Sequence, residues 1–494
     1  MKRFVKIMAL MLTFIIAASI SSCKKEEGSR QENTPSKGTQ EPQEPVGELR
    51  MLSLSSITLD STFSRENDIV LQSAQEVTWE SADEAIVTVD ESGEVIAVGE
   101  GSTVIKATTK DGSRTEECKV TVKKLTEMND SELADYCYTK AMLSYGNADR
   151  IARAMNKADN GEEITVAVIG GSITAGANAS DFGKTSYGPL MSEWWKAKFP
   201  NTKVNFVNAG AGGTDSLYGV TRANEELLKS NPDFVIVEFS VNDKEFGEYN
   251  KKYLSEVYEG LLRKIMNSQN KPGVIIFENT YNTGTNAEKT HVPVAEHYNV
   301  PILSYKSAIW PVIRYSNAFG KVNEAWKVFY GDDIHPNDKG HKLISEIIIR
   351  YLDSVYDQRK AYSAPNDTLT DIMNETNRFE DADFLTAGNM KDLELGDWVN
   401  SGRFFNTSTP GASMKFKNTA GVIALDYVKG QKAKGEVYID GEKVADINAS
   451  KDGNWTAGTG VQFVLDEKDA KEREIEIKLT SGSFKFEFFA AKFN

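Results

Sequence analysis

Cysteine and histidine are both scarce in this chain. Its 494 residues include three cysteines and four histidines. Three cysteines are too few for a disulfide framework, although a single bridge between Cys118 and Cys137 stays open. The sequence also lacks an H-E-x-x-H motif, a Cys/His cluster and an acidic calcium loop. We therefore expect no required metal and no cofactor.

Positive charge is scarce too. Lysine and arginine number 57 against 72 aspartates and glutamates, which gives a formal net charge of −15. Binding to nucleic acid needs clustered basic side chains, so we predict no nucleic-acid partner. A chain of this length is too long for one hydrophobic core, and several domains are expected.

The N-terminus is typical of a targeting segment. The basic start "MKRFVK" is followed by "IMALMLTFIIAASI", which is too short to span a membrane comfortably. Residues 1–22 are therefore predicted to be a signal peptide, and the polar residues 23–48 a disordered tether. One interpretation of this segment is a plain secretory signal in which Cys23 is incidental.

The boundary "ISSC", which ends at Cys23, resembles the lipobox of bacterial lipoproteins. That resemblance implies that Cys23 is lipidated and becomes the mature N-terminus. The protein would then be anchored to a membrane of the bacterial cell envelope, facing the periplasm or lying on the cell surface.

Residues 49–123 carry short strand signals separated by turn signals such as "ESGE", "GEGS" and "KDGS". Near the end, Cys118, Val120 and Val122 alternate with polar residues, so Cys118 is predicted to lie in a core. The pattern "VTWES…IVTVDESGEVIAVGEGSTVIKATTKDG" resembles the group 2 bacterial Ig-like domains. It implies a β-sandwich that acts as a spacer.

Residues 125–360 alternate apolar runs with helical patterns. The runs "ITVAVIG", "KVNFVNAG", "DFVIVEFS", "GVIIFE" and "VPILSY" are expected to be strands buried on both faces. The segment 251–267 has one apolar helical face. Alternation of this kind predicts an α/β domain with a parallel sheet, whose ligands bind beyond the carboxyl ends of the strands.

Residues 375–494 return to strand patterns. The segment "GEVYIDGEKVADI" predicts a hairpin that turns at Asp440–Gly441. We expect a C-terminal β-sandwich of jelly-roll-like form. Its Trp398 and Trp455 either stack against sugar rings or pack in the core.

A candidate nucleophile, Ser172, stands among glycines in "VIGGSITAG", directly after the first apolar run. A hydroxyl nucleophile needs a base. Of the four histidines, His335 in "YGDDIHPND" has Asp332 three residues before it, a spacing that lets the carboxylate meet the imidazole. His291 and His297 lie in "HVPVAEHYN", a segment whose one acidic residue at a helpful position is Glu296.

Two more loops offer hydrogen-bond donors. "VNAGAGGTDS" contains Gly213 and "EFSVND" contains Asn242. Together with the Ser172 N–H, they could stabilise a tetrahedral oxyanion. Glu238, which alternation places on the same strand face as Asn242, is expected to be a structural carboxylate that bonds a neighbouring loop. His341 is predicted to pack or cap in the last helix.

The order Ser172, Gly213, Asn242, then Asp332 with His335, resembles the SGNH (GDSL-type) hydrolases. The resemblance implies a flavodoxin-like three-layer fold. It implies Ser172 as nucleophile, His335 as general base and Asp332, rather than Asp333, as its orienting carboxylate. Gly213 and Asn242 carry over as oxyanion donors.

Two positions depart from the family pattern: Gly171 replaces the aspartate of the first motif, and Ser240 replaces the glycine of the third. The wording "GGSITAG…SYGPLMSEWW…NAGAGGTDS…VEFSVND" resembles carbohydrate-deacetylating members. It implies a serine esterase that removes short acyl groups, acetyl above all, from a polysaccharide or oligosaccharide.

Other functions stay open. One is a glycan-binding surface lipoprotein or adhesin with an inactive hydrolase domain. Others are an esterase or lipase of different acyl specificity, or an O-acetyltransferase. Trp310, Trp326 and Tyr330, which precede Asp332, could form an aromatic wall for sugar rings.

Overall fold

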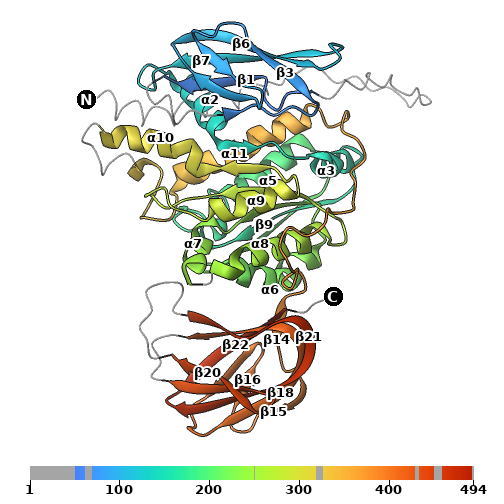
Figure 1. Cartoon of the computed structure of the whole chain (residues 1–494), viewed down its shortest axis with the longest axis vertical. Helices are drawn as coiled ribbons and strands as arrows, with labels where there is room; N and C mark the ends of the chain where they lie inside the picture. The colour runs from blue at the N-terminus through green and yellow to red at the C-terminus, as the bar shows by residue number, and fades with distance from the viewer. Residues whose placement is uncertain are drawn as a thin grey trace, which may run out of the picture.

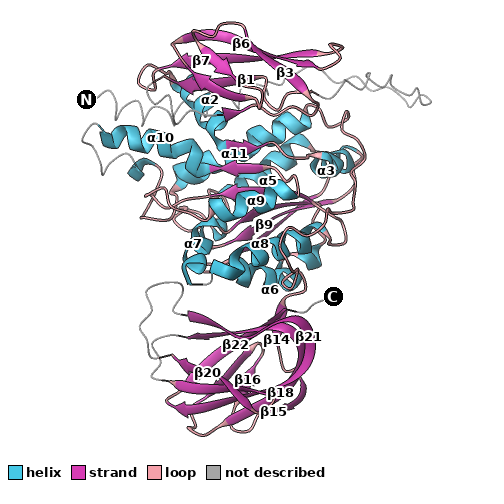
Figure 2. Cartoon of the chain, in the orientation of Figure 1, coloured by secondary structure: helices cyan, strands magenta, loops and turns pink. Residues whose placement is uncertain are grey.

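The computed structural model of the chain describes residues 50–61, 69–249, 251–318, 326–428, 433–449 and 459–491. These residues form three parts stacked along the long axis of the molecule, with the helices gathered in the middle part (Figures 1 and 2). The predicted signal peptide, the tether, Cys23 and Trp455 lie outside the described residues. Within the described ranges, no helix is both long and apolar enough to cross a membrane.

The N-terminal part consists of two small sheets, with strand orders β1-β7-β6-β3 and β2-β5-β4. Cys118 is fully buried in the core between them, as its alternation with polar residues predicts. Cys118 and Cys137 are both free thiols, so the disulfide left open by the sequence is not formed. The strands are β1 (Ser56–Asp60), β2 (Ile69–Val70), β3 (Val77–Ser81), β4 (Val87–Val89), β5 (Glu94–Ala97), β6 (Gly101–Thr109) and β7 (Thr115–Lys123).

The central part is built on one six-stranded sheet with the order β10-β9-β11-β12-β13-β8. Its first five strands are parallel, and β8 pairs antiparallel at one edge. Numbered along the chain, the parallel strands follow the order 2-1-3-4-5, which is that of flavodoxin-like folds. The predicted α/β class is confirmed. The strands are β8 (Met142–Ser144), β9 (Ile164–Gly170), β10 (Val204–Gly210), β11 (Phe234–Glu238), β12 (Gly273–Glu278) and β13 (Ile302–Ser304).

Helices cover both faces of this sheet and form a separate apolar cluster with each face. One cluster packs α2, α3, α5, α10 and α11, and the other packs α6, α8 and α9. The predicted helix 251–267 is α8, and its apolar face is buried. The helices are α2 (Asp130–Ala141), α3 (Asp149–Asp159), α4 (Ser172–Ala175), α5 (Tyr187–Lys198), α6 (Ser216–Glu226), η1 (Leu228–Ser230), α7 (Ser240–Tyr249), α8 (Lys251–Met266), α9 (Glu288–His297), α10 (Tyr305–Ala318), η2 (Trp326–Val328) and α11 (Asp338–Tyr356).

One predicted strand differs from its expectation. The run "KVNFVNAG" was expected to be buried on both faces, but most residues of β10 are half-exposed. The reason is its place in the sheet: β10 is the edge strand and pairs only with β9. By contrast, every residue of the neighbouring strand β9 is buried.

The C-terminal part is a nine-stranded antiparallel sheet that curls on itself beneath α6 and α8 (Figure 1). The predicted hairpin is formed by β19 and β20, and both turn residues, Asp440 and Gly441, have positive φ, as a tight hairpin turn requires. The strands are β14 (Asp383–Leu385), β15 (Lys391–Glu394), β16 (Val399–Ser401), β17 (Phe404–Thr407), β18 (Ser413–Val428), β19 (Lys434–Ile439), β20 (Glu442–Asn448), β21 (Thr459–Ser481) and β22 (Phe484–Ala491).

Candidate active site

Three strands of the central sheet end at the same edge. Gly170 at the end of β9 pairs with Gly210 of β10 on one side and with Glu238 of β11 on the other. The loops that follow these strands therefore start side by side, since parallel strands present their carboxyl ends together. These loops carry Ser172, Gly213 and Asn242.

Ser172 is the first residue of the short helix α4, directly after β9. A residue in this position has an N–H that the helix itself does not use. At the preceding Gly171, a Cβ would lie 2.2 Å from Oδ1 of Asn242, so a side chain there would force the Asn242 amide to move. The Asn242 side chain thus lies directly against the backbone that holds Ser172.

Ser172, His335 and Asp332 form a hydrogen-bonded series. Oγ of Ser172 lies 2.8 Å from Nε2 of His335, and Nδ1 of His335 lies 2.8 Å from Oδ2 of Asp332. His335 comes from the loop before α11, after the last strand of the sheet, whereas Ser172 follows β9, the first of the parallel strands. The imidazole can take the hydroxyl proton at one nitrogen while the carboxylate fixes its other nitrogen as a donor.

The loop of Asp332 is wound around its carboxylate. Oδ1 accepts the backbone N–H of Ile334 and of His335, and Oδ2 accepts Nδ2 of Asn178. Burial alone would raise the pKa of Asp332, but the hydrogen bonds from His335 and these N–H groups hold it below its usual value. The neighbouring Asp333 instead accepts Nδ2 of Asn282.

A buried hydrogen-bond donor lies beside Ser172. Nδ2 of Asn242 is inaccessible to water and has no hydrogen-bond partner among the described residues. Such a group is costly to bury unless a ligand satisfies it. On the other side of Ser172, Gly213 has a φ of 72°, so its turn requires glycine. The turn approaches closely, since a Cβ on Gly212 would lie 3.9 Å from Cβ of Ser172.

Glu238 behaves as the sequence predicts, although one step of that reasoning was wrong. Its Oε2 accepts Oγ1 of Thr174, two residues beyond Ser172. However, Asn242 does not continue the strand: β11 ends at Glu238, and Asn242 lies in the first turn of α7. Burial, aided by the nearby carboxylate of Glu278, raises the pKa of Glu238 to about 7.

The other histidines do not reach Ser172. His341 is buried in α11 and donates from Nε2 to the carbonyl of Ala177, so it packs as predicted. His297 donates to the carbonyl of Asp371. The acidic partners of His291 lie outside its own segment, where the sequence offered only Glu296.

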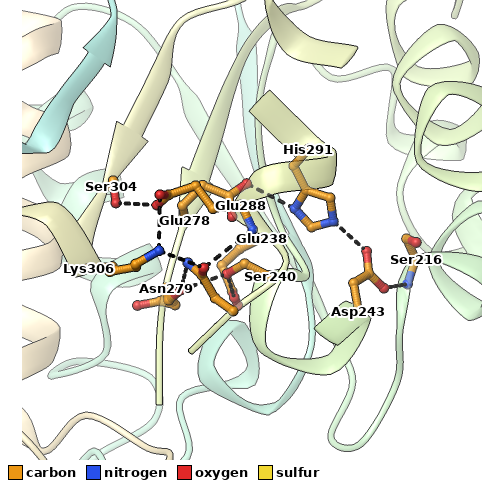
Figure 3. Close-up of polar contacts among 11 residues, drawn as sticks. Ser216, Glu238, Ser240, Asp243, Glu278, Asn279, Glu288, His291, Ser304 and Lys306 are labelled. Atoms are coloured by element: carbon orange, nitrogen blue, oxygen red, sulfur yellow. Dashed lines mark hydrogen bonds and ion pairs between the residues drawn. The ribbon is translucent and has the colours of Figure 1, made fainter. Parts of the chain in front are cut away.

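His291 is fully buried between two carboxylates, those of Asp243 and Glu278, each 2.9 Å away (Figure 3). Asp243 and Glu278 are 48 and 13 residues distant along the chain. One sequence signal could have found them: Glu278 ends a predicted strand, and Asp243 directly follows Asn242.

The predicted aromatic wall is only partly available. Tyr330 is buried, and its hydroxyl donates to the carbonyl of Thr280, so it belongs to the core. Trp310 and Trp326 are half-buried and pack against the same core. In the C-terminal part, Trp398 is 3% exposed, which favours packing over sugar stacking.

Two protein families match parts of this chain. Residues 168–343 match the GDSL-like lipase/acylhydrolase family, and residues 60–120 match the bacterial Ig-like domain (group 2). Ser172, Gly213, Asn242, Asp332 and His335 all fall inside the first match. No curated protein sequence matches the chain.

Two solved structures are similar over most of the chain. Both are crystal structures of a two-domain esterase (CEX) active on acetylated mannans, one of them co-crystallized with mannopentaose. Each is 27% identical to this chain and covers 72% of it, with TM-scores of 0.62 and 0.61. The alignments include 98% and 99% of those chains.

The fold, the family match and these neighbours define a carboxylic ester hydrolase of the SGNH type. In this chain the GDSL-like acylhydrolase domain lies between a group 2 bacterial Ig-like domain and a C-terminal β-sheet part.

Proposed function

We propose that this esterase removes acetyl groups from a polysaccharide or oligosaccharide through an acyl-enzyme on Ser172. The observation that carries the proposal is the series in which Oγ of Ser172 lies 2.8 Å from His335, with Asp332 on the other imidazole nitrogen. The unpartnered Nδ2 of Asn242 supports it, because an oxyanion would supply the missing acceptor.

In the first half-reaction, Oγ of Ser172 attacks the acetyl carbonyl while Nε2 of His335 takes the hydroxyl proton. The carbonyl oxygen gains a negative charge, which the N–H groups of Ser172 and Gly213 and Nδ2 of Asn242 stabilise. The tetrahedral intermediate collapses, and His335 gives its proton to the sugar oxygen that leaves. Water, deprotonated by His335, then releases acetate from Ser172.

Acetylated mannan is the substrate class to try first. The two-domain esterase of the similar crystal structures is active on acetylated mannans. The likeness extends over nearly the whole of that chain and so includes more than the catalytic domain.

The decisive measurement is acetate release from a panel of acetylated mannans, acetylated xylans and acetylated manno-oligosaccharides. We expect release from at least one of them, and none from Ser172→Ala. An organophosphonate that reacts with serine should label the wild type at Ser172 alone. Labelling elsewhere, or a variant with activity within about tenfold of wild type, contradicts the nucleophile assignment.

The size of the acyl group separates an acetylesterase from a lipase. We expect kcat/KM for an aryl acetate to exceed that for an aryl butyrate at least about tenfold, a difference of roughly 1.4 kcal/mol. An aryl octanoate should be nearly inert. Preference for the octanoate would indicate a deep apolar pocket and would favour the lipase alternative.

We further propose that the protein is a lipoprotein of the bacterial cell envelope, anchored through Cys23. The lipobox-like "ISSC" after a short apolar segment supports this. Mass spectrometry of the mature N-terminus should find acyl chains on Cys23, and Cys23→Ser should move the protein out of the membrane fraction. A mature chain that keeps an unmodified Cys23 contradicts the anchor.

A further inference from the structure

A buried charge cluster lies behind the candidate active site. His291 of α9 is enclosed between Asp243 of α7 and Glu278, the last residue of β12, and none of the three side chains is exposed (Figure 3). The three do not converge as metal ligands would: no group of three or more His, Cys, Asp or Glu in the described chain could hold a metal ion.

The two flanking carboxylates favour a His291 that carries both ring protons. Nδ1 and Nε2 each lie 2.9 Å from a carboxylate oxygen, and an ionised carboxylate can only accept. Burial alone would lower the pKa of His291, but the Glu278 and Asp243 carboxylates raise it to about 10. The ring is therefore an imidazolium at neutral pH.

The aromatic neighbour of His291 fits a cation as well. The Tyr258 ring of α8 stacks on the imidazole with centroids 3.7 Å apart and an interplanar angle of 5°. The titratable groups that face His291 are thus Asp243 from α7, Glu278 from β12 and Tyr258 from α8. Glu238 and Glu288 act on these neighbours from further away.

Asp243 connects the His291 cation with the two loops that carry the proposed oxyanion donors Gly213 and Asn242. Its Oδ2 faces His291, while its Oδ1 accepts the backbone N–H of Ser216 at 2.7 Å. Ser216 begins α6, three residues after Gly213. Along the chain, Asp243 directly follows Asn242. One carboxylate therefore ties the turn of Gly213 to the residue that carries the unpartnered amide.

We propose that His291 is a positioning residue for ester hydrolysis. As an imidazolium it fixes the Asp243 carboxylate, and Asp243 in turn holds Asn242 and the Gly213 turn in place around Ser172. His291 itself does not touch the reacting atoms. The inference rests on the proposed function, because it takes Asn242 and Gly213 as the oxyanion donors.

A neutral side chain cannot replace this ring. In His291→Gln, the amide presents donors on one side only and turns its carbonyl oxygen toward the other carboxylate. Asp243 and Glu278 would then be buried without a countercharge, which is strongly unfavourable. We expect the first turn of α7 to shift, and Asn242 with it.

The test is a double-mutant cycle with His291→Gln, Asn242→Ala and the double variant, assayed on an aryl acetate. Removal of one oxyanion donor typically costs about 10²–10³ in kcat. If His291 acts through Asn242, His291→Gln alone should lower kcat roughly 10–100-fold with KM changed less than about threefold. In the Asn242→Ala background it should cost less than about threefold.

A matched control separates positioning from loss of stability. Glu259 is a fully buried carboxylate of α8 that holds Tyr298 and the backbone N–H groups of Met373 and Asn374, away from the oxyanion donors. Glu259→Gln should lower Tm and leave kcat within about twofold of wild type.

A second variant keeps the inference testable if His291→Gln does not fold. Glu278→Gln preserves an acceptor for Nδ1 and removes one of the two charges that keep His291 protonated. Its kcat should fall with rising pH at a lower pH than that of the wild type, because His291 loses its proton earlier.

The outcomes distinguish the two proposals. An undiminished cost of His291→Gln in the Asn242→Ala background, or an unchanged alkaline limb in Glu278→Gln, overturns the role of His291. If Asn242→Ala itself keeps kcat within about threefold of wild type, the oxyanion assignment fails, and the role of His291 fails with it. Phosphonate labelling of Ser172 tests the nucleophile independently of both.

Discussion

Two adjacent aspartates of one loop, Asp332 and Asp333, accept hydrogen bonds from different partners. Asp332 accepts hydrogen bonds from His335 and Asn178, whereas Asp333 accepts from Asn282. Both carboxylates are close to the imidazole in sequence, but only Asp332 can orient it. The difference can be tested because the two residues are chemically identical and share one loop.

We expect Asp332→Asn to lower kcat by about 10²–10⁴, because the amide favours the wrong imidazole tautomer. The same change at Asp333 should cost less than about fivefold, since Asp333 bonds another loop. Steady-state kinetics of both variants on an aryl acetate checks this. Equal losses would mean that the wrong carboxylate has been assigned to His335.

The raised pKa of Glu238 predicts that the free energy of unfolding depends on pH. Its pKa is raised to about 7, so the folded chain favours the protonated acid more than the unfolded chain does. Its contribution to folding is therefore fully present below about pH 4.5 and lost as the pH rises through about 7, on the order of 3 kcal/mol in total.

In Glu238→Gln the titrating proton is absent and an acceptor for Thr174 remains. Between pH 5 and pH 8 the free energy of unfolding should fall less in this variant than in the wild type. A residual slope is expected from Asp215, whose pKa burial and Asp243 also raise to about 7. Urea unfolding at several pH values is the measurement. The exposed Glu225→Gln is the control and should retain the wild-type slope.

At the level of elements, the site depends on how closely strand ends approach. The register places Gly170, Gly210 and Glu238 side by side, and α7 then starts within two residues of β11. This short connection brings the first turn of α7 against Gly171. The absence of a side chain at Gly171 therefore leaves room for the Asn242 amide in its observed position.

Gly171→Ala should displace Asn242, since the added Cβ would lie 2.2 Å from its Oδ1. We expect kcat/KM to fall by about 10²-fold, comparable to the loss of one oxyanion donor. Gly388→Ala is the control, because its nearest contact, Oγ1 of Thr386, is an ordinary 3.7 Å away. Activity within about threefold of wild type in Gly171→Ala would contradict the close approach.

At the scale of the whole molecule, the C-terminal sheet and the central domain share one apolar cluster. Phe463 of β21 stacks on Tyr253 of α8 with ring centroids 3.8 Å apart. Beside it, Arg378 bridges Glu256 of α8 and Asp466 of β21. An apolar contact reinforced by the largely buried Arg378–Glu256 pair favours a rigid junction over independent domains.

We therefore expect the central and C-terminal parts of the wild type to unfold in one calorimetric transition. Phe463→Ala should remove about 2 kcal/mol, less than the ~3–5 kcal/mol of a fully buried phenylalanine. The C-terminal part should then unfold in a separate transition at lower temperature. Val399→Ala, at a residue that is 64% exposed, should keep the single transition. Two transitions in the wild type would contradict the rigid junction.

Local signals in the sequence determined the class of the fold and the residues of the candidate site. The apolar runs and helical patterns sufficed for an α/β domain, and Asp440–Gly441 sufficed for a hairpin. Ser172, Gly213 and Asn242 could be grouped because each follows a strand, and parallel strands end at one edge. Asp332 could be paired with His335 because they share a single turn of chain.

Only the tertiary structure decided what depends on strand order and on contacts between distant elements. β10 is half-exposed because it lies at an edge, which its apolar residues do not reveal. Tyr330 and Trp398 are buried by neighbours that the sequence does not identify. His291 meets Asp243 and Glu278 because α7, α9 and β12 pack together. The positions of Glu278 and Asp243 near predicted strand ends are visible in the sequence, but separations of 13 and 48 residues from His291 become contacts only through folding.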